Sequence, residues 1–348
     1  PKLAGMKPII IANNGTVTVV EPTAPNWYDY KDQGTYGIDS KTSIWANAQT
    51  LDNSQFVWIP RYAYKIVSGY HGEGIVAGQA GEIDVKFLIG TTDKYMKDGV
   101  ETALPADYIV HPAFTFGTDK LTGIWVGKCV ASNNNGNVKT YPNISIWSSI
   151  DIAHMFDACF TMATNNTYGF TGLTNGNTHM MKNIEWGAVA YLTHSKYGRN
   201  GIEVTSSNSS LLTSGGNPIT NTNQSTTGNI SGIYDMSGGV WKYVAGNLNF
   251  TLSRGGSAPH FDNIWNNDIE RVKYFDRYNL NDNSVKGDAF YETANWFSDY
   301  NDFLGSPYPW FLRSGRMDSG NRSGIFSSTN EYGSGGPLAG FIPVFFVP

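Results

Sequence analysis

The stretch from Gly232 to Tyr243 constrains the fold of this chain more than any other segment. It reads Gly-Ile-Tyr-Asp-Met-Ser-Gly-Gly-Val-Trp-Lys-Tyr, so glycines lie among apolar and aromatic residues. Glycine is needed where the backbone takes positive φ values or where another backbone approaches closely. Both needs arise where a strand turns into a packed corner. The segment therefore predicts such a corner in a chain of short strands and loops.

The composition is typical of a loop-rich protein that contains β-structure. Of 348 residues, 15% are charged, 14% are aromatic and 39 are glycine. Abundant aromatic residues with little charge argue against disorder, because aromatic side chains build a core even where helices are few. The net charge is −5 without a basic run, so we expect no nucleic-acid partner. No apolar run reaches the length of a transmembrane helix, so we expect no membrane span in this chain.

The two cysteines and the first residue leave questions open. Cys129 and Cys159 could pair in an exported protein or could be two small buried hydrophobes. No signal peptide is visible, and a chain that begins at Pro1 leaves open whether a targeting segment precedes it.

The first hundred residues predict short strands. The run 8–11, a turn at 13–15 and the run 16–20 predict a hairpin, because an Asn-Gly turn lies between β-branched residues. The run 57–66 predicts one strand, in which Pro60 indicates an edge or a bulge. Another short strand is expected at 85–89.

Two segments have apolar residues at helical spacing. The first covers 152–160, with Ser148 as the expected N-cap. The second follows Thr178, also an expected N-cap, and should end near Gly198. From 199 to 231 the chain is rich in Ser, Thr, Asn and Gly, and we expect an exposed, long and irregular excursion.

The segment Gly232–Tyr243 belongs to a series of blocks between residues 105 and 348. The other blocks are, in chain order, 111–114 with 123–133, 143–147, 179–190, 309–315 and 339–344. Together they resemble the formylglycine-generating-enzyme-like (sulfatase-modifying-factor) branch of the C-type lectin fold, whose signature is roughly G-L-Y-D-M-S-G-N-V-W-E-W. Arg254–Ser257 matches that family's R-G-G-S motif, but it lies far from the chain's end and ranks behind Pro309–Gly315.

The resemblance implies an α+β protein of the C-type lectin fold, with two helices, short antiparallel strands and long loops after a small β segment. It divides the chain into an attachment or assembly segment, 1–105, and a ligand-binding domain, 106–348. The variable C-terminal face would cover about 310–341. Blocks around 58–62 and 182–187 are similar to a subgroup from Gram-positive bacteria and their phages. Some proteins of this class are variable proteins of diversity-generating retroelements.

The residues that the family's enzymes need are missing from their expected positions. The oxidase branch uses two cysteines between the R-G-G-S strand and the closing strand, and no cysteine lies between Arg254 and Phe341. The sulfoxide-synthase branch needs a histidine cluster, whereas the six histidines here have no i, i+4 pair. These are at positions 71, 111, 154, 179, 194 and 260. We therefore expect no enzyme activity, no catalytic residues, no metal and no cofactor.

Other polar residues favour structural roles. Where the family has G-N-V-W-E, Gly239 replaces Asn and Lys242 replaces Glu, so an oxygen-rich calcium site is not carried over; whether any calcium is bound stays open. The run 279–283 is interpreted as an Asn-turn loop. Glu185 is expected to bond backbone or an arginine from inside the second helix. His111 is interpreted as a turn residue before a proline, and His179 as a residue that packs on the core at the helix start.

The segment 313–337 has the composition of a binding loop. It is mostly Ser, Gly, Asn, Arg and Asp, a set that we expect to present hydrogen-bonding groups rather than to build core. Adenine-targeted diversification, which the resemblance implies, leaves the same residues. The candidate ligand-binding residues are Arg316, Asp318, Ser319, Asn321, Arg322, Ser327, Asn330 and Tyr332, flanked by Trp265, Asn266, Asn267, Trp296, Tyr300 and Tyr308. A core position is an equal alternative for Trp296.

Taken together, the residues and the resemblance predict a non-enzymatic receptor-binding protein on a phage tail or an extracellular bacterial surface. Its partners would be a host-surface protein or carbohydrate, the structure that carries it, and further copies of itself, since weak sites gain by avidity. One alternative is an enzyme on the same scaffold, either a metal-dependent oxidase or a carbohydrate-active protein. Another is a structural decoration or pilin-like subunit. The sequence identifies neither the ligand, the carrier nor the subunit count.

Overall fold

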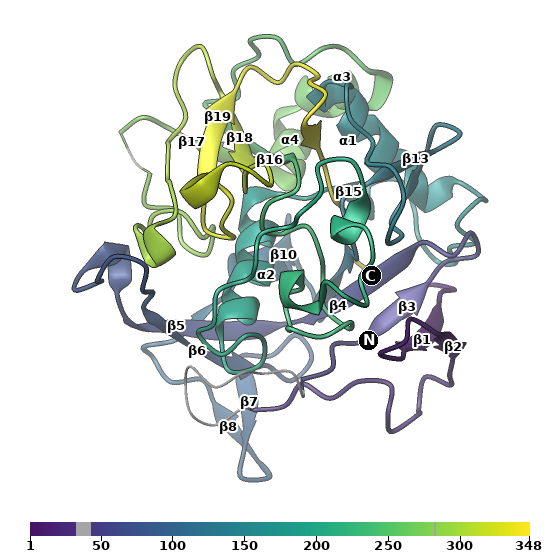
Figure 1. Cartoon of the computed structure of the whole chain (residues 1–348), viewed down its shortest axis with the longest axis vertical. Helices are drawn as coiled ribbons and strands as arrows, with labels where there is room; N and C mark the ends of the chain where they lie inside the picture. Colours follow the sequence, from purple (N-terminus) through teal and green to yellow (C-terminus); the bar gives the residue numbers. More distant parts are fainter. Residues whose placement is uncertain (33–42, 282) are drawn as a thin grey trace.

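A seven-stranded sheet joins the first and the last parts of the chain. The computed structural model describes residues 1–32, 43–281 and 283–348. The strand order in this sheet is β15-β21-β12-β4-β3-β1-β2. The strands are β1 (Lys7–Ile11), β2 (Val17–Val19), β3 (Asn47–Gln49), β4 (Gln55–Pro60), β12 (Gly123–Gly127), β15 (Thr178–Met180) and β21 (Pro343–Phe345). Strands from both sides of the expected boundary at residue 105 therefore share one sheet (Figure 1).

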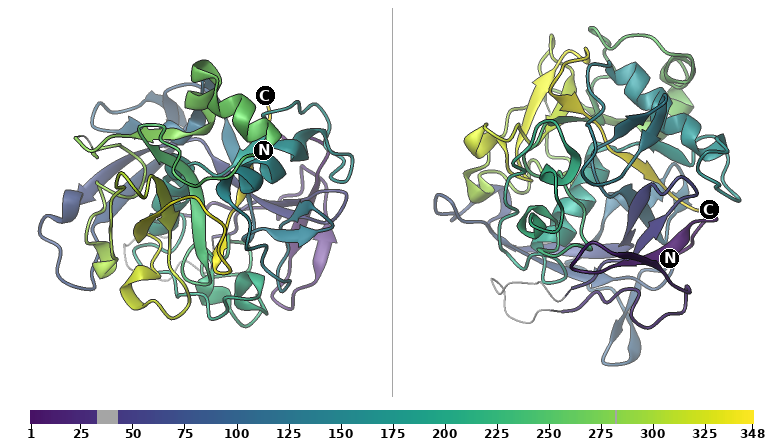
Figure 2. Two further views of the ribbon diagram at one scale, coloured as in Figure 1. Left: turned by 90° about the horizontal axis from the view of Figure 1, so that it is seen from above. Right: turned by 45° about the vertical axis from the view of Figure 1, so that its right-hand side comes forward.

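The N-terminal hairpin is confirmed. β1 and β2 are antiparallel, with Ile9 opposite Val19 and Ile11 opposite Val17. Gly15 in the turn has φ of 83°, which suits glycine. The two ends of the described chain also lie side by side (Figure 2), and the Lys2 ammonium donates to the Pro348 carbonyl.

The prediction of one strand over 57–66 is wrong. β4 ends at Pro60, and β5 (Tyr62–Ser68) begins in a different sheet, where it pairs with β6 (Glu82–Phe87) and β9 (Ile109–Val110). Pro60 lies opposite Gly123 of β12, but the pairing of β4 with β3 ends at Val57, so Pro60 has a neighbouring strand on one side only, as expected for an edge position. A proline has no N–H for further pairing, so the chain leaves one sheet there and enters the next. β6 covers most of the strand expected at 85–89.

The predicted corner is confirmed. Gly238 and Gly239 have φ of 67° and 80°, and a Cβ on Gly238 would stand 2.0 Å from Ser206 Oγ. The corner leads into β16 (Trp241–Leu248), the longest strand of a five-stranded sheet. That sheet has the order β17-β16-β18-β19, with β20 also on β16. Its other strands are β17 (Asp276–Tyr278), β18 (Trp310–Arg313), β19 (Ser328–Glu331) and β20 (Ala339–Gly340).

Both predicted helices form, but their expected caps are wrong. α1 (Ile152–Phe160) is capped by Asp151, whose carboxylate accepts from the His154 N–H at 3.0 Å, and Ser148 lies outside. Thr178 belongs to β15, where it pairs with Phe345, so it cannot cap α2 (Asn183–His194). α2 ends at His194, ahead of the expected Gly198.

The N-terminus of α2 is closed by a side chain within the helix. Glu185 Oε2 accepts from the Lys182 N–H at 2.8 Å, which confirms that Glu185 bonds backbone. This bond satisfies an amide that the start of a helix leaves without an intrahelical partner. The described ranges also contain α3 (Pro259–Trp265) and α4 (Asp268–Tyr274). None of the helices within those ranges has the length and apolar character needed to cross a bilayer.

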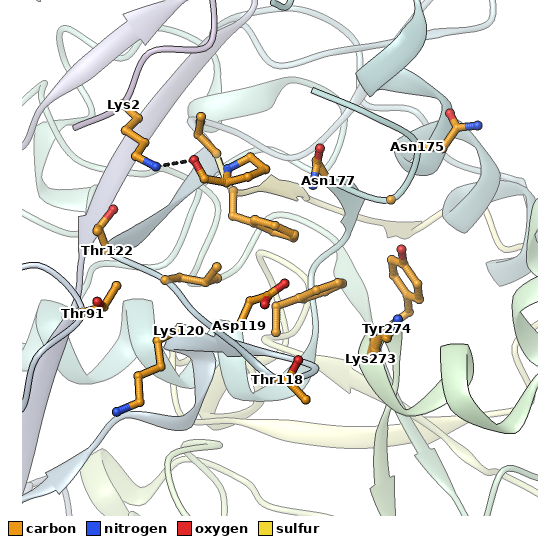
Figure 3. A pocket seen from close by; sticks show the side chains of 16 residues that line it. Lys2, Thr91, Thr118, Asp119, Lys120, Thr122, Asn175, Asn177, Lys273 and Tyr274 are labelled. Atoms are coloured by element: carbon orange, nitrogen blue, oxygen red, sulfur yellow. Dashed lines mark hydrogen bonds between the residues drawn. The ribbon is translucent and has the colours of Figure 1, made fainter. Parts of the chain in front are cut away.

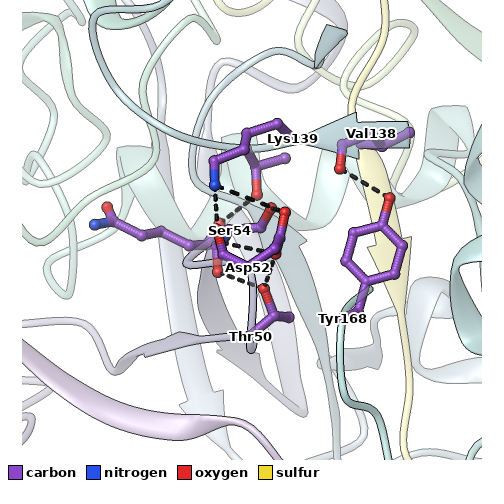
Figure 4. Close-up of polar contacts among 8 residues, drawn as sticks. Thr50, Asp52, Ser54, Val138, Lys139 and Tyr168 are labelled. Atoms are coloured by element: carbon purple, nitrogen blue, oxygen red, sulfur yellow. Dashed lines mark hydrogen bonds and ion pairs between the residues drawn. The ribbon is translucent and has the colours of Figure 1, made fainter. Parts of the chain in front are cut away.

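Three small hairpins complete the described strands. They are β7 (Lys94–Lys97) with β8 (Val100–Ala103), β10 (Thr115–Phe116) with β11 (Asp119–Lys120), and β13 (Ser132–Asn134) with β14 (Asn137–Lys139). Polar contacts hold the last hairpin to the body of the protein (Figure 4). Lys139 pairs with Asp52 at 3.7 Å, and Asp52 accepts from Thr50 Oγ1 at 2.6 Å. Tyr168 donates to the Val138 carbonyl at 2.8 Å.

The segment 199–231 is irregular as predicted, but it is not exposed throughout. Residues 224–228 are buried. Their small hydroxyl side chains bond the neighbouring backbone: Thr226 Oγ1 accepts from the Ile233 N–H at 2.9 Å, and Ser225 Oγ donates to the Thr222 carbonyl at 3.0 Å. Serine and threonine can therefore lie inside the protein, since their polar groups are satisfied locally.

The cysteines are two separate buried thiols. Neither Cys129 nor Cys159 forms a disulfide, and both side chains are fully buried. This agrees with the alternative in which they act as small hydrophobes.

Candidate binding face

The chain between β18 and β19, residues 314–327, forms a loop that is held from the inside. The Ser314 hydroxyl donates to the Ser323 carbonyl at 2.9 Å, and the Ser323 hydroxyl donates to the Arg316 carbonyl at 2.6 Å. The Ser327 hydroxyl donates to the Gly324 carbonyl at 2.8 Å. Short side chains therefore fold back onto the loop's own backbone and fix its course.

The glycine corner supports this 314–327 loop. The Gly238 N–H donates to Ser314 Oγ and to the Ser323 carbonyl, both at 2.7 Å. The Met317 N–H donates to the Gly239 carbonyl at 3.2 Å. A helix adds another support, because Trp186 Nε1 of α2 donates to the Ile325 carbonyl at 2.9 Å. The segment that most constrains the fold thus lies directly beneath the predicted binding loop.

The expectation that 313–337 cannot build core is wrong for residues 323–328. All six are buried, and Phe326 has no exposed surface. Phe326 packs against Trp296 with ring centroids 5.3 Å apart. Its N–H donates to the carboxylate of Asp299 at 3.0 Å. Serines and glycines allow this because they let the backbone itself enter the interior.

The outer side of the loop carries polar side chains. Arg316 and Asp318 form a two-bond ion pair, with N–O distances of 3.0 and 2.7 Å. This contact raises the pKa of Arg316 and lowers that of Asp318. Ser319 Oγ accepts from the Arg316 N–H at 3.2 Å. Asn321 and Arg322 are exposed, and the Arg322 guanidinium lies 4.2 Å from the centre of the Tyr300 ring.

A second group of outer side chains lies where β19 ends. The rings of Tyr308 and Tyr332 are 4.3 Å apart, and their hydroxyls are 3.0 Å apart. The Arg254 guanidinium lies 5.1 Å from the centre of the Tyr332 ring. Asn330 Nδ2 donates to the Phe303 carbonyl at 2.5 Å. Arg254 belongs to the R-G-G-S match that ranked second, and it lies beside the predicted face although sequence reasoning did not select it.

Several predicted residues lie beneath the face or beside it. Ser327 and Trp296 are fully buried, and Trp265 is 5% exposed, so these three side chains support neighbouring segments instead of facing solvent. Trp265 packs against Trp310 of β18, with ring centroids 5.3 Å apart. Asn267 is exposed and caps α4 through the Ile269 and Glu270 N–H groups.

Beneath β18 is a buried charged group that the sequence did not reveal. Arg313 is fully buried and donates to the Ala289 carbonyl at 2.7 Å. Burial raises the pKa of Asp288 to about 7 and that of Asp299 to about 8. Glu292 Oε2 accepts from the hydroxyl of Tyr64 at 2.6 Å. Perturbed carboxyl groups can mark a reactive site, but these side chains are at most 5% exposed, which favours a structural role.

The corner position where the family has glutamate holds a buried lysine. Lys242 donates to the Gly238 carbonyl, and burial lowers its pKa to about 7. Asp235 Oδ2 accepts from the Ser214 N–H at 3.0 Å. Within the part of the chain that the structure describes, no three His, Cys, Asp or Glu side chains gather as a metal site would require. Asp282, in the oxygen-rich 279–283 run, lies outside the described residues.

The histidines with proposed structural roles are buried. His111 caps the turn after it, as expected for a residue before Pro112, and burial lowers its pKa to about 3. His179 lies in β15 and not at the helix start, and its Nε2 is 2.8 Å from Glu185 Oε1. Burial raises the pKa of Glu185, but His179 and Lys182 outweigh this effect and keep it below its usual value.

A separate cleft of about 590 Å³ lies between the β10–β11 hairpin, α4 and the C-terminal residues (Figure 3). Phe116, Tyr274 and Phe346 supply its aromatic surface. Lys120 and Lys273 at the cleft have partners, since Lys273 pairs with Glu270 at 2.7 Å and Lys120 with Asp93 at 3.7 Å. No residue of the predicted face lines this cleft, and no sequence motif pointed to it.

No protein-family model and no curated protein matches this sequence. Among solved structures, the chain is similar to variable protein 1 of Treponema denticola at 10% identity and a TM-score of 0.34, over 86% of this chain and 98% of that one. It is similar to the Major Tropism Determinant I1 variant at 12% identity and a TM-score of 0.34, over 100% of this chain and 74% of that one. It is also similar to the Major Tropism Determinant M1 variant, at 12% identity and a TM-score of 0.33, over 99% of this chain and 73% of that one.

Proposed function

We propose that this protein is a non-enzymatic binding protein whose 314–327 loop, together with Tyr308 and Tyr332, contacts a ligand on another cell or particle. In this proposal the scaffold is a C-type lectin fold of the formylglycine-generating-enzyme-like branch. The exposed residues of the loop are the ones that vary, as in a target of a diversity-generating retroelement. The protein is displayed on a phage tail or on a bacterial surface.

The main support for the proposal is that the 314–327 loop has a firmly bonded inner backbone and exposed outer side chains. Its backbone is held by Ser314, Ser323 and the glycine corner, none of which faces solvent. Its outer side chains, such as Asp318 and Asn321, are exposed and take no part in the bonds from Ser314, Ser323 and the glycine corner. Substitutions at such exposed positions usually change stability by less than about 0.5 kcal/mol. The loop can therefore change its binding residues without changing its shape.

The position of the face also suits display. β18 and β19 lie across the molecule from β1, β2, β3, β7 and β8 (Figure 1). We propose that the segment 1–105 attaches the protein to its carrier and to further copies, so that the face points away from the attachment. Several copies on one carrier would gain affinity through avidity.

The experiment is the combined substitution of Arg316, Asn321 and Arg322 by Ala. Fluorescently labelled protein is tested on a panel of Gram-positive bacterial strains, and thermal melting is measured for each variant. We expect loss of cell binding with an almost unchanged melting temperature, because these side chains are at the surface and exposed ion pairs contribute about 0–1 kcal/mol. A control with Asp119 and Lys120 replaced by Ala, at exposed positions of the β10–β11 hairpin outside the segment 1–105, should bind as the unchanged protein does.

Two outcomes contradict the proposal. If the triple variant binds cells as well as the unchanged protein, the face lies elsewhere. If the protein binds no strain and no surface glycan, the alternative of a structural decoration or pilin-like subunit is favoured. The diversification claim is tested separately: a reverse transcriptase gene beside a near-copy of the coding region for residues 310–341, differing at adenines, is expected in the genome.

A further inference from the structure

Two exposed arginines lie over tyrosine rings at the two ends of β19. The Arg322 guanidinium lies 4.2 Å from the centre of the Tyr300 ring, and that of Arg254 lies 5.1 Å from the centre of the Tyr332 ring. Within the described ranges neither arginine forms an ion pair with a carboxylate. By contrast, Arg316 is paired with Asp318 at 2.7 Å. Two positive charges on this face are therefore left for a ligand.

The tyrosine rings prepare these arginines for an anion. An aromatic face attracts the guanidinium plane and limits its movement, while the N–H groups at the edge remain available. A carboxylate or sulfate then accepts two parallel N–H bonds, and less conformational freedom is lost when it binds. The arrangement favours a ligand with anionic groups over one with cationic or purely apolar groups.

The two arginine–tyrosine pairs lie at opposite ends of β19, which favours an extended ligand. The Tyr300 carbonyl accepts from the Ser328 N–H at 2.9 Å, so Tyr300 lies beside the first residue of β19. Tyr332 directly follows Glu331, the last residue of the strand. Four residues of strand span about 13 Å. A chain with repeated negative charges suits two anchoring points at this backbone separation better than one small anion does.

The edge of β19 is already covered, which argues against a peptide that adds as a strand. The segment 300–303 runs alongside: the Asp302 N–H donates to the Ser328 carbonyl at 3.1 Å, and Asn330 Nδ2 donates to the Phe303 carbonyl at 2.5 Å. Addition of a strand needs free main-chain groups at the sheet edge. Because the main chain of Ser328 is already paired and the Asn330 side chain is bonded to Phe303, recognition through side chains is favoured on this face.

The same face offers an aromatic surface for a sugar ring. Tyr308 is 37% exposed and packs against Tyr332, so the Arg254, Tyr332 and Tyr308 side chains form a continuous row. An aromatic ring with nearby hydrogen-bonding groups is a common setting for a bound ring of mixed polarity. Glu331 is half-buried, and its Oε1 accepts from the Tyr332 N–H at 2.8 Å.

We propose that the ligand of this face is an acidic polysaccharide, which lies along β19 with anionic groups on Arg254 and Arg322 and a sugar ring on Tyr308. The inference rests on the proposed function, since it names the chemical class that the same face binds. Carboxylated and sulfated sugars share this chemistry, and the two sources are separated in the test.

The test measures the binding of oligogalacturonate, sulfated dextran and neutral maltohexaose by isothermal titration calorimetry. We expect binding of at least one acidic polymer, weakening as salt is added, and little binding of maltohexaose. Whichever acidic polymer binds more tightly identifies the anionic group. Arg254→Gln and Arg322→Gln should each weaken it on the order of tenfold, because each removes charge-assisted hydrogen bonds. Tyr308→Ala should weaken it as well.

The matched control is Arg277→Gln. Arg277 is also exposed and lies over an aromatic ring, 5.7 Å from the centre of Phe250, but it belongs to β17 at the opposite edge of the sheet. We expect this variant to bind the acidic polymer unchanged. An equal loss in Arg277→Gln would indicate attraction by charge in general and would overturn the inference.

Other results separate this inference from the proposed function. If the Arg316, Asn321 and Arg322 triple variant loses cell binding while the unchanged protein binds no acidic polymer, the face is a binding site and its ligand class is wrong. Tighter binding of hexaglutamate than of any acidic polysaccharide would overturn the inference in favour of an acidic peptide. If acidic polymer binds through Arg254 while the triple variant still binds cells, the inference stands and the proposed cell-binding role fails.

Discussion

The carboxyl group of Asp299 lies directly against the backbone of Gly324. A Cβ on Gly324 would stand 1.8 and 2.0 Å from the two carboxyl oxygens of Asp299. Glycine at this position therefore lets the 314–327 loop approach the carboxyl group, which accepts from the Phe326 N–H. Burial of Asp299 against this loop raises the pKa of its carboxyl group to about 8.

Replacement of Asp299 by Asn should become more favourable as the pH rises. The pKa of Asp299 is higher in the folded state than its ordinary value of 3.8, so its contribution to stability is full below that value and is lost as pH rises through about 8. The amide oxygen of Asn can still accept from Phe326. We expect the stability difference between Asp299→Asn and the unchanged protein to shift by about 3–4 kcal/mol in favour of the variant between pH 5 and pH 8. Thermal melts at both pH values measure this shift, and a pH-independent difference contradicts the prediction.

Replacement of Gly187 by Ala should destabilise the protein strongly. A Cβ at this position in α2 would stand 1.8 Å from the Gly287 carbonyl oxygen, and main-chain atoms cannot give way as a flexible side chain does. We expect a loss of about 3 kcal/mol or more, measured by urea denaturation. The control is Gly336→Ala, where no atom lies within 4 Å of the new Cβ and stability should be unchanged. Similar stability for both variants would show that α2 does not pack against residue 287 in this way.

The two cysteines should be unreactive in the folded protein. Both are buried, and burial raises the pKa of each thiol well above its ordinary value, so little reactive thiolate forms at neutral pH. Mass spectrometry after treatment with iodoacetamide should find no modification under native conditions and modification of both Cys129 and Cys159 in guanidinium. Rapid native labelling at either position would contradict the buried placement.

Residues 106–348 alone should not form a stable soluble domain. Their strand β12 pairs with β4 along Gly123–Gly127, and removal of β4 would expose that edge together with Trp125. An open edge beside apolar residues is prone to aggregation. Expression of the shortened chain, followed by size-exclusion chromatography and near-UV circular dichroism, measures this. A monomer with native-like spectra would instead support residues 106–348 as an independent unit.

The sequence predicted which helices and strands form more accurately than it predicted where they begin and end or which residues they contact. The 8–20 hairpin and α1 were predictable because turn residues and apolar spacing act locally. The start of α2 was not, since Thr178 pairs with Phe345, a residue 167 positions further along the chain. Pairings of this kind leave no local pattern. Thr178 therefore belongs to the sheet and does not cap α2.

The exposure of the candidate residues was predictable in part. Composition selected Asp318, Asn321 and Arg322, which are exposed as expected, whereas Arg316 and Ser319 are half-buried. It did not reveal that Ser323 and Ser327 are buried, because serine is common both at surfaces and in backbone contacts. Arg254 was passed over, since its 78-residue separation from Tyr332 gives no sequence signal for their contact.

The place of β21 within the sheet has a consequence for synthesis of the protein. Residues 343–345 insert between β12 and β15, while β12 also holds the strands formed from the first sixty residues. Those early strands can pair among themselves as they leave the ribosome. The sheet closes only after residue 345 has emerged from the exit tunnel. Until that moment the nascent chain has an unfilled gap between β12 and β15, so this sheet cannot be completed before residue 345 has left the tunnel.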